Sequence, residues 1–146
     1  MAELEDFACD FAARLTDLVK QADSDKAVVI GLRGELGAGK TAFTKEVVKI
    51  FGNDRNVTSP TFVILKNYAL PEKDDKQKFS RIVHIDAYRL KNAHELEVLG
   101  WADILADKNN LVLIEWPEIV SDIMPDDTIY LDFKHVDEIT REIHEK

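Results

Sequence analysis

Cysteine is nearly absent from this 146-residue sequence, since Cys9 is its single cysteine. An internal disulfide and a cysteine-rich metal site are therefore excluded. No two of the four histidines have metal-ligand spacing, so we expect no zinc. No apolar run approaches the roughly 20 residues that a membrane-spanning helix needs, and the acidic start MAELEDFACD lacks a signal-peptide pattern. We therefore expect a cytoplasmic protein with no membrane contact.

Positive charge is also scarce. The chain has 19 lysines and arginines against 28 acidic residues, a formal net charge of -9. Such a chain is repelled by nucleic-acid phosphates, which disfavours strong direct binding to DNA or RNA. The length fits one domain, residues 1–146, with a sizeable core.

Hydrophobic periodicity predicts an α/β fold with a mixed sheet. Apolar residues at three- and four-residue steps indicate an N-terminal helix over residues 4–22, and a second helix follows the glycine-rich loop and ends at Gly52. Two short helices split at Gly100 are expected later. The tail EITREIHEK fits either an edge strand or a short helix. The expected strands are Ala27–Leu32, Phe62–Leu65 pairing with Arg81–Tyr88 as a hairpin, Asn110–Trp116, and the segment DTIYLDFKHV.

The stretch GELGAGKT, Gly34–Thr41, matches the phosphate-binding pattern G-x-x-x-x-G-K-[ST] between an expected strand and an expected helix. Glycines let successive backbone N–H groups turn toward an anion, and the helix N-terminus favours negative charge. Lys40 is suited to the β- and γ-phosphates, and the Thr41 hydroxyl to Mg²⁺. The predicted nucleotide-binding residues are Leu36, Gly37, Ala38, Gly39, Lys40, Thr41 and Ala42.

A phosphate loop needs a carboxylate at a strand end to complete a magnesium shell. Two acids follow apolar strands: Asp86 ends RIVHID, and Glu115 ends NLVLIE. We predict that Thr41 and Glu115 lie near the metal. Asp86 either joins the metal shell or orients the attacking water, and the residues leave that choice open. Lys40, Asp86 and Glu115 are the predicted catalytic residues.

Other residues have weaker signals. Thr61 in SPTF is either a switch-like sensor of the γ-phosphate or a threonine that caps a turn. Arg89 in DAYR either neutralises phosphate charge or pairs with surface acids. For Trp116, a packing role is favoured over a role as an aromatic lid or a partner surface. His84 and Trp101 are assigned to the core or its margin.

Phosphate loops occur in kinases, GTPases and ATPases, so the loop alone does not name the reaction. The guanine-binding motif Asn-Lys-x-Asp is missing, and the six arginines are scattered rather than gathered in a lid. An ATPase whose output is a conformational change fits best. The alternatives are a small kinase of a metabolite and a non-catalytic ATP sensor.

Five segments occur in the order and spacing of one known family: GELGAGKTAFTK, SPTFVILKNY, HIDAYRL, ELEVLGWADIL and LVLIEWPE. Across about Ala27–Glu118 the sequence resembles the bacterial TsaE (YjeE) family. The resemblance implies a three-layer P-loop NTPase-like fold with unusual, partly antiparallel strand order.

The resemblance also implies a function. ATP would be the nucleotide and substrate, with Mg²⁺ as cofactor. Lys40, Thr41, Glu115 and Asp86 would occupy the family's phosphate, magnesium and second acidic positions, and the segments with Thr61 and Arg89 its switch-like positions. The partners would be TsaB and TsaD, which transfer a threonylcarbamoyl group to adenosine in tRNA, so tRNA would be met indirectly. Weak ATP hydrolysis would reset that complex for further turnovers.

Overall fold

The computed structural model of the chain describes residues 2–22, 25–35, 38–53, 64–71, 79–135 and 141–145. These residues form a six-stranded sheet in the order β2-β3-β4-β1-β5-β6. The strands are β1 (Val28–Gly34), β2 (Leu65–Ala69), β3 (Arg81–Asp86), β4 (Asn110–Glu115), β5 (Ile129–His135) and β6 (Arg141–Glu145).

The four central strands are parallel, and both edge strands run the other way. β3, β4, β1 and β5 pair in parallel, whereas β2 pairs antiparallel with β3 and β6 antiparallel with β5. The predicted α/β fold with a mixed, partly antiparallel sheet is confirmed. β4 is buried along its whole length, which explains why NLVLIE is continuously apolar up to its last residue.

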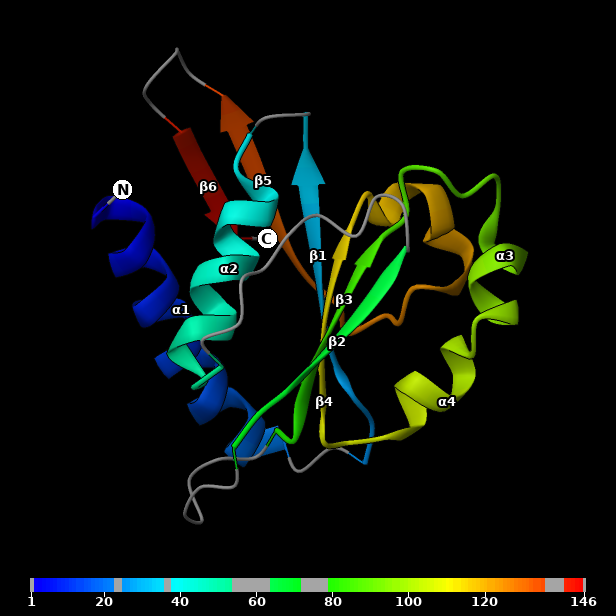
Figure 1. Cartoon of the computed structure of the whole chain (residues 1–146), viewed down its shortest axis with the longest axis horizontal. Helices are drawn as coiled ribbons and strands as arrows, with labels where there is room; N and C mark the ends of the chain where they lie inside the picture. The colour runs from blue at the N-terminus through cyan, green and yellow to red at the C-terminus, as the bar shows by residue number, and fades with distance from the viewer. Residues whose placement is uncertain are drawn as a thin grey trace.

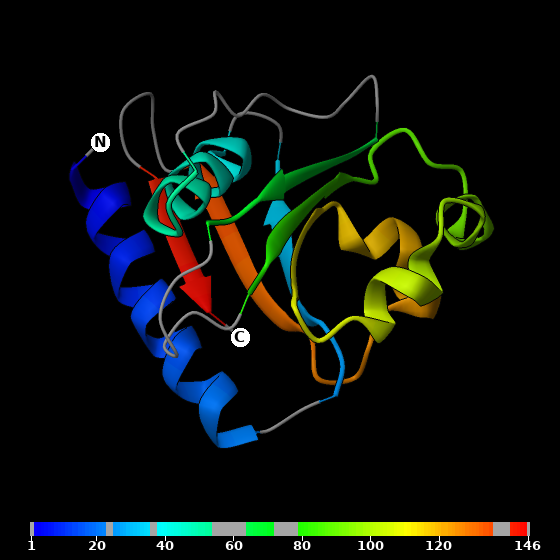
Figure 2. The same ribbon diagram turned by 60° about the horizontal axis from the view of Figure 1, so that its bottom comes forward.

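Helices cover both faces of the sheet (Figures 1 and 2). One layer holds α1 (Ala2–Ala22) and α2 (Lys40–Ile50); the other holds α3 (Ala93–Val98), α4 (Trp101–Ala106) and the 3₁₀ helix η1 (Pro117–Ile123). Successive residues of a strand point to opposite faces. Leu111 and Leu113 of β4 therefore pack in the core under α1 and α2, and Val112 and Ile114 pack in the core under α3, α4 and η1.

An aromatic cluster joins α1 and α2 to the sheet. The Phe43 ring of α2 lies 5.8 Å from that of Phe11 and 5.5 Å from that of Phe133, both edge to face. Phe43 and Phe11 are buried, and each contributes about 1.5–3 kcal/mol through the apolar surface it removes from water. The cluster anchors α2 two residues after Thr41.

One predicted strand differs from the structure in its position, and the structure resolves the ambiguous assignment of the C-terminal tail. The predicted strand Phe62–Leu65 overlaps the observed strand only at its last residue, because β2 runs from Leu65 to Ala69. Ile64, just before it, has a positive φ of 69°. Phe62 itself lies outside the described residues. The described part of the ambiguous tail, Arg141–Glu145, forms a strand, β6. The hairpin of β2 with β3 and the helix pair split at Gly100 are confirmed.

None of the helices in the described part of the chain is long and apolar enough to cross a bilayer.

Candidate functional site: a phosphate loop above two buried carboxylates

Three parallel strands bring the candidate residues to one edge of the sheet. Leu32 of β1 pairs with Glu115 of β4, and Glu115 pairs with Asp86 of β3. The arrowheads of β1, β3 and β4 point to the same side in Figure 1. The loop after β1 therefore lies beside both carboxylates, at the edge where open α/β sheets bind their ligands.

The glycines of the loop occupy conformations that other residues avoid. Gly34 has φ 146°, and a Cβ built there would lie 2.4 Å from the backbone oxygen of Phe133. Gly39 has φ 103° and caps the N-terminus of α2, which begins at Lys40. Ala38 is buried beside it, and Ala42 lies in the first turn of α2. The predicted phosphate-loop residues Leu36 and Gly37 lie outside the described residues.

Lys40 lies inside this loop rather than in solvent. Its residue is only 4% exposed, and its ammonium group donates to the carbonyl of Gly34. The same group lies 3.7 Å from the ring centre of Trp116, a cation–π contact. Burial lowers the pKa of Lys40 below its ordinary value, and the negative charges of Glu115, Glu118 and Asp86 oppose that shift. The Lys40 ammonium, buried at the phosphate loop, is therefore in a position to bind an anionic group there.

Glu115 is the centre of the polar contacts at this edge. The Thr41 hydroxyl donates to its carboxylate, at 3.2 Å from Oε2 and 3.4 Å from Oε1. Nε2 of His84 lies 2.6 Å from Oε2. Asp86 accepts a hydrogen bond from the backbone N–H of Tyr88 at 3.0 Å, which fixes the turn after β3. The structure thus brings Lys40, Thr41, Asp86 and Glu115 together.

Two aromatic residues also lie beside the site: Trp116, for which the sequence favours packing over a lid or partner surface, and Tyr88, for which it indicates no role. Trp116 has a left-handed backbone (φ 60°, ψ 48°), which turns the chain sharply after β4. Its ring lies 5.2 Å from that of Tyr88, and the Lys40 ammonium lies over it. The available signal was position: each residue follows a candidate acid by one or two places.

The remaining predicted residues contribute differently. Arg89 is exposed on the turn after β3, and Thr61 lies outside the described residues. His84 is completely buried, as expected for a core residue, but it also touches Glu115. Trp101 is buried, and its indole N–H donates to the carbonyl of Ile123.

The donor set fits a hard divalent cation that keeps much of its water. Asp86 and Glu115 are buried carboxylates on adjacent strands, and Thr41 adds a hydroxyl. No three His, Cys, Asp or Glu residues in the described part of the chain form a cage for a metal. Mg²⁺ suits this arrangement because it is commonly held by one or two carboxylates together with substrate phosphates and water.

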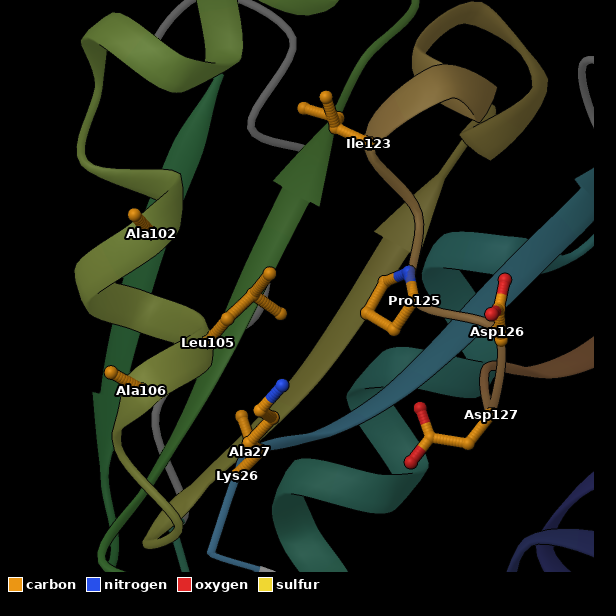
Figure 3. Close-up of a pocket in the computed structure, with 9 residues that line it drawn as sticks. All are labelled: Lys26, Ala27, Ala102, Leu105, Ala106, Ile123, Pro125, Asp126 and Asp127. Atoms are coloured by element: carbon orange, nitrogen blue, oxygen red, sulfur yellow. The ribbon is translucent and has the colours of Figure 1, made fainter.

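A separate cavity of about 570 Å³ lies at the opposite end of β1 (Figure 3). Its walls include Ala27 before β1, Leu105 of α4, and the segment Pro125–Asp127 before β5. The phosphate loop follows the other end of β1. The cavity is therefore not part of the candidate site.

The strand–loop–helix arrangement, with carboxylates on neighbouring strand ends, defines a P-loop NTPase-like fold. The solved structure of Bacillus subtilis YdiB has the same fold: it superposes with a TM-score of 0.64 at 26% identity, covering 97% of this chain and 76% of that one.

The chain belongs to the TsaE family. The family model described as threonylcarbamoyl adenosine biosynthesis protein TsaE matches residues 3–143. The TsaE protein of Rickettsia prowazekii is 40% identical over 110 residues, 75% of this chain and 70% of that protein. That of Rickettsia bellii is 36% identical over 140 residues, 95% of this chain and 85% of that protein. The family takes part in tRNA threonylcarbamoyladenosine biosynthesis.

Proposed function

We propose that this chain is a weak, Mg²⁺-dependent ATPase of the cytoplasm that acts with TsaB and TsaD. ATP hydrolysis would reset their complex between threonylcarbamoyl transfers to tRNA. The observation that carries the proposal is the contact of Thr41 with Glu115 directly below the phosphate loop. That contact joins the residue suited to Mg²⁺ to a buried carboxylate, as nucleotide hydrolysis requires.

Each residue has one role in this proposal. The N–H groups of the loop and the Lys40 ammonium bind the β- and γ-phosphates. Thr41 and Glu115 would hold Mg²⁺, which would supply positive charge beside the phosphates. Asp86, held toward the turn by the Tyr88 N–H, orients the attacking water from the neighbouring strand. Lys40 exchanges its neutral acceptor, the carbonyl of Gly34, for charged oxygens, which form stronger hydrogen bonds.

Slow hydrolysis by the isolated chain agrees with the ion pairs of two described arginines. Arg33 forms an ion pair with Asp132, and Arg81 forms one with Asp107. Arg89, exposed on the turn after Asp86, is a candidate among the described residues for neutralising phosphate charge. A partner that supplies an arginine can raise the rate of a P-loop enzyme by about 10³–10⁵.

The test is ATP hydrolysis by the chain alone and with TsaB, TsaD and tRNA. We expect slow hydrolysis alone, a clear increase with the partners, and loss of both in Lys40→Ala. Asp86→Ala should bind ATP but not hydrolyse it, and Glu115→Ala should lose hydrolysis together with the affinity that Mg²⁺ adds. A rate of ATP hydrolysis that is unchanged by TsaB, TsaD and tRNA would contradict the proposed role of these partners. A phosphorylated metabolite formed by wild type, and not by Lys40→Ala, would favour the kinase instead.

A further inference from the structure

His84 is a buried polar residue to which the proposed mechanism assigns no role. It lies on β3, its relative exposure is 0%, and its Nε2 lies 2.6 Å from Oε2 of Glu115 on β4. Alternation along β3 places His84 on the same face as Asp86, two residues away, and as Ile82, which packs in the core under α2. The imidazole is therefore in the layer directly behind the candidate site.

We assign the donor of this contact as Nε2–H, because a carboxylate oxygen accepts hydrogen bonds and the 2.6 Å separation requires one donor. Nδ1 of His84 is buried and has no hydrogen-bond partner among the described residues. The tautomer with its proton on Nε2 leaves Nδ1 as an acceptor. All the directional bonding of the imidazole that the structure describes is thus aimed at one oxygen of Glu115.

The second described donor to Glu115, the Thr41 hydroxyl, makes longer contacts than His84 does. The Thr41 hydroxyl lies 3.2 Å from one carboxylate oxygen and 3.4 Å from the other, so its hydrogen bond is shared between them. Both distances exceed the 2.6 Å between His84 Nε2 and Oε2. Thr41 is also the residue whose oxygen must turn to a cation. A short bond to a carboxylate from the core side fixes its orientation when such a cation arrives.

We propose that His84 is a positioning residue for Glu115: its Nε2–H holds Oε2 and sets the direction in which the carboxylate faces Thr41 and the phosphate loop. The inference rests on the proposed function in one respect, which is that Glu115 acts on Mg²⁺. It differs from a simple packing role, because an apolar side chain of similar bulk would then serve equally well.

The test compares His84→Leu, which keeps bulk but has no donor, with His84→Gln, whose longer amide restores an N–H. Ile82→Val, on the same strand face and fully buried, controls for loss of packing. Affinity for a non-hydrolysable ATP analogue is measured by calorimetry with Mg²⁺ and with EDTA. We expect His84→Leu to lose about 10–100-fold of the affinity that Mg²⁺ adds, as supporting residues of metal sites do.

His84→Gln should recover most of that affinity, and Ile82→Val should match wild type. Binding in EDTA should be the same in all four proteins. If His84→Leu keeps the full Mg²⁺ effect, or loses no more than Ile82→Val, the inference is overturned while the proposed function stands. If wild type itself shows no Mg²⁺ effect, both are overturned. Should His84→Leu fail to fold, His84→Asn replaces it, because its amide ends short of the Nε2 position.

A second measurement needs no nucleotide. Long-range ¹H–¹⁵N spectra of the free protein report which ring nitrogen of His84 carries the proton. We expect the proton on Nε2 in wild type, and a changed Nε2 signal in Glu115→Gln with little change at other histidines. A proton on Nδ1 in wild type would overturn the inference, since Nε2 could not then donate to Glu115.

Discussion

The functional edge depends on single residues held away from their usual surroundings. Lys40 is buried with its ammonium between a backbone carbonyl and an indole ring, although lysines normally remain in water. Glu115 is buried between a hydroxyl and an imidazole. Such groups lower the stability of the free protein, and they are typical of sites that bind a charged ligand.

The pH dependence of stability tests the burial of Lys40. Burial lowers its pKa below 10.5, so between the lowered value and 10.5 the unfolded chain binds more protons than the folded one. The free energy of unfolding contributed by Lys40 therefore rises with pH in that window. We expect wild type to gain stability relative to Lys40→Met as the pH rises toward 10.5, measured by urea unfolding with EDTA and no nucleotide.

Lys45→Met is the matched control, because Lys45 is exposed on the same helix and its loss changes the net charge equally. A constant or falling difference between wild type and Lys40→Met would contradict the account of Lys40.

Gly34→Ala tests the close approach of the loop to β5. Its positive φ costs about 1–3 kcal/mol for an alanine, and the new Cβ would meet the Phe133 carbonyl at 2.4 Å. Overpacking of this kind adds about 1–3 kcal/mol. Gly100→Ala is the control, since Gly100 has φ 97° with open space around it, and only about 1–2 kcal/mol is expected. Equal losses in urea unfolding would show that the contact with Phe133 does not matter.

At the scale of elements, much of the site could be predicted because its parts are local. A glycine loop between strand and helix, and acids directly after apolar runs, are contiguous patterns. Two features could not be predicted this way. The His84–Glu115 contact joins residues 31 apart and depends on the register of β3 against β4. The positive φ of Ile64, the residue before β2, is not indicated by any propensity.

The packing of α1 on α2 gives a prediction at this scale. Phe11 is 3% exposed and contacts Phe43 edge to face, so Phe11→Ala should lower the free energy of unfolding by about 3–5 kcal/mol. Phe7→Ala, at a half-buried position one helical turn earlier, should cost clearly less. Urea unfolding of the two variants measures both. A Phe11 loss no larger than the Phe7 loss would mean that α1 is not anchored through this cluster.

At the scale of the whole molecule, the α/β class was predictable from periodicity, but the order of the strands was not. Which strands become neighbours depends on pairing between distant segments, as when β1 lies between β4 and β5. Periodicity predicted the mixed sheet and its hairpin, and the resemblance of five motifs to one family added the P-loop NTPase-like fold. The net charge of -9 likewise belongs to the whole molecule.

That net charge predicts how strongly the isolated chain binds tRNA. Repulsion between an acidic protein and phosphates should leave the isolated chain without measurable binding to tRNA at physiological salt. We expect tRNA to be retained only when TsaB and TsaD are present, as measured by fluorescence anisotropy of labelled tRNA. Salt-sensitive binding by the chain alone would reveal a direct contact that the proposal does not include.

The most direct test of the central claim counts products. The quantity is the number of threonylcarbamoyladenosine residues formed per TsaD, with TsaB, tRNA, ATP and the threonylcarbamoyl adenylate supplied. With wild type the account predicts several products per TsaD. With Glu115→Gln, which should bind ATP without cleaving it, it predicts about one product per TsaD. Several products with Glu115→Gln would contradict the account, because ATP binding alone would then be enough.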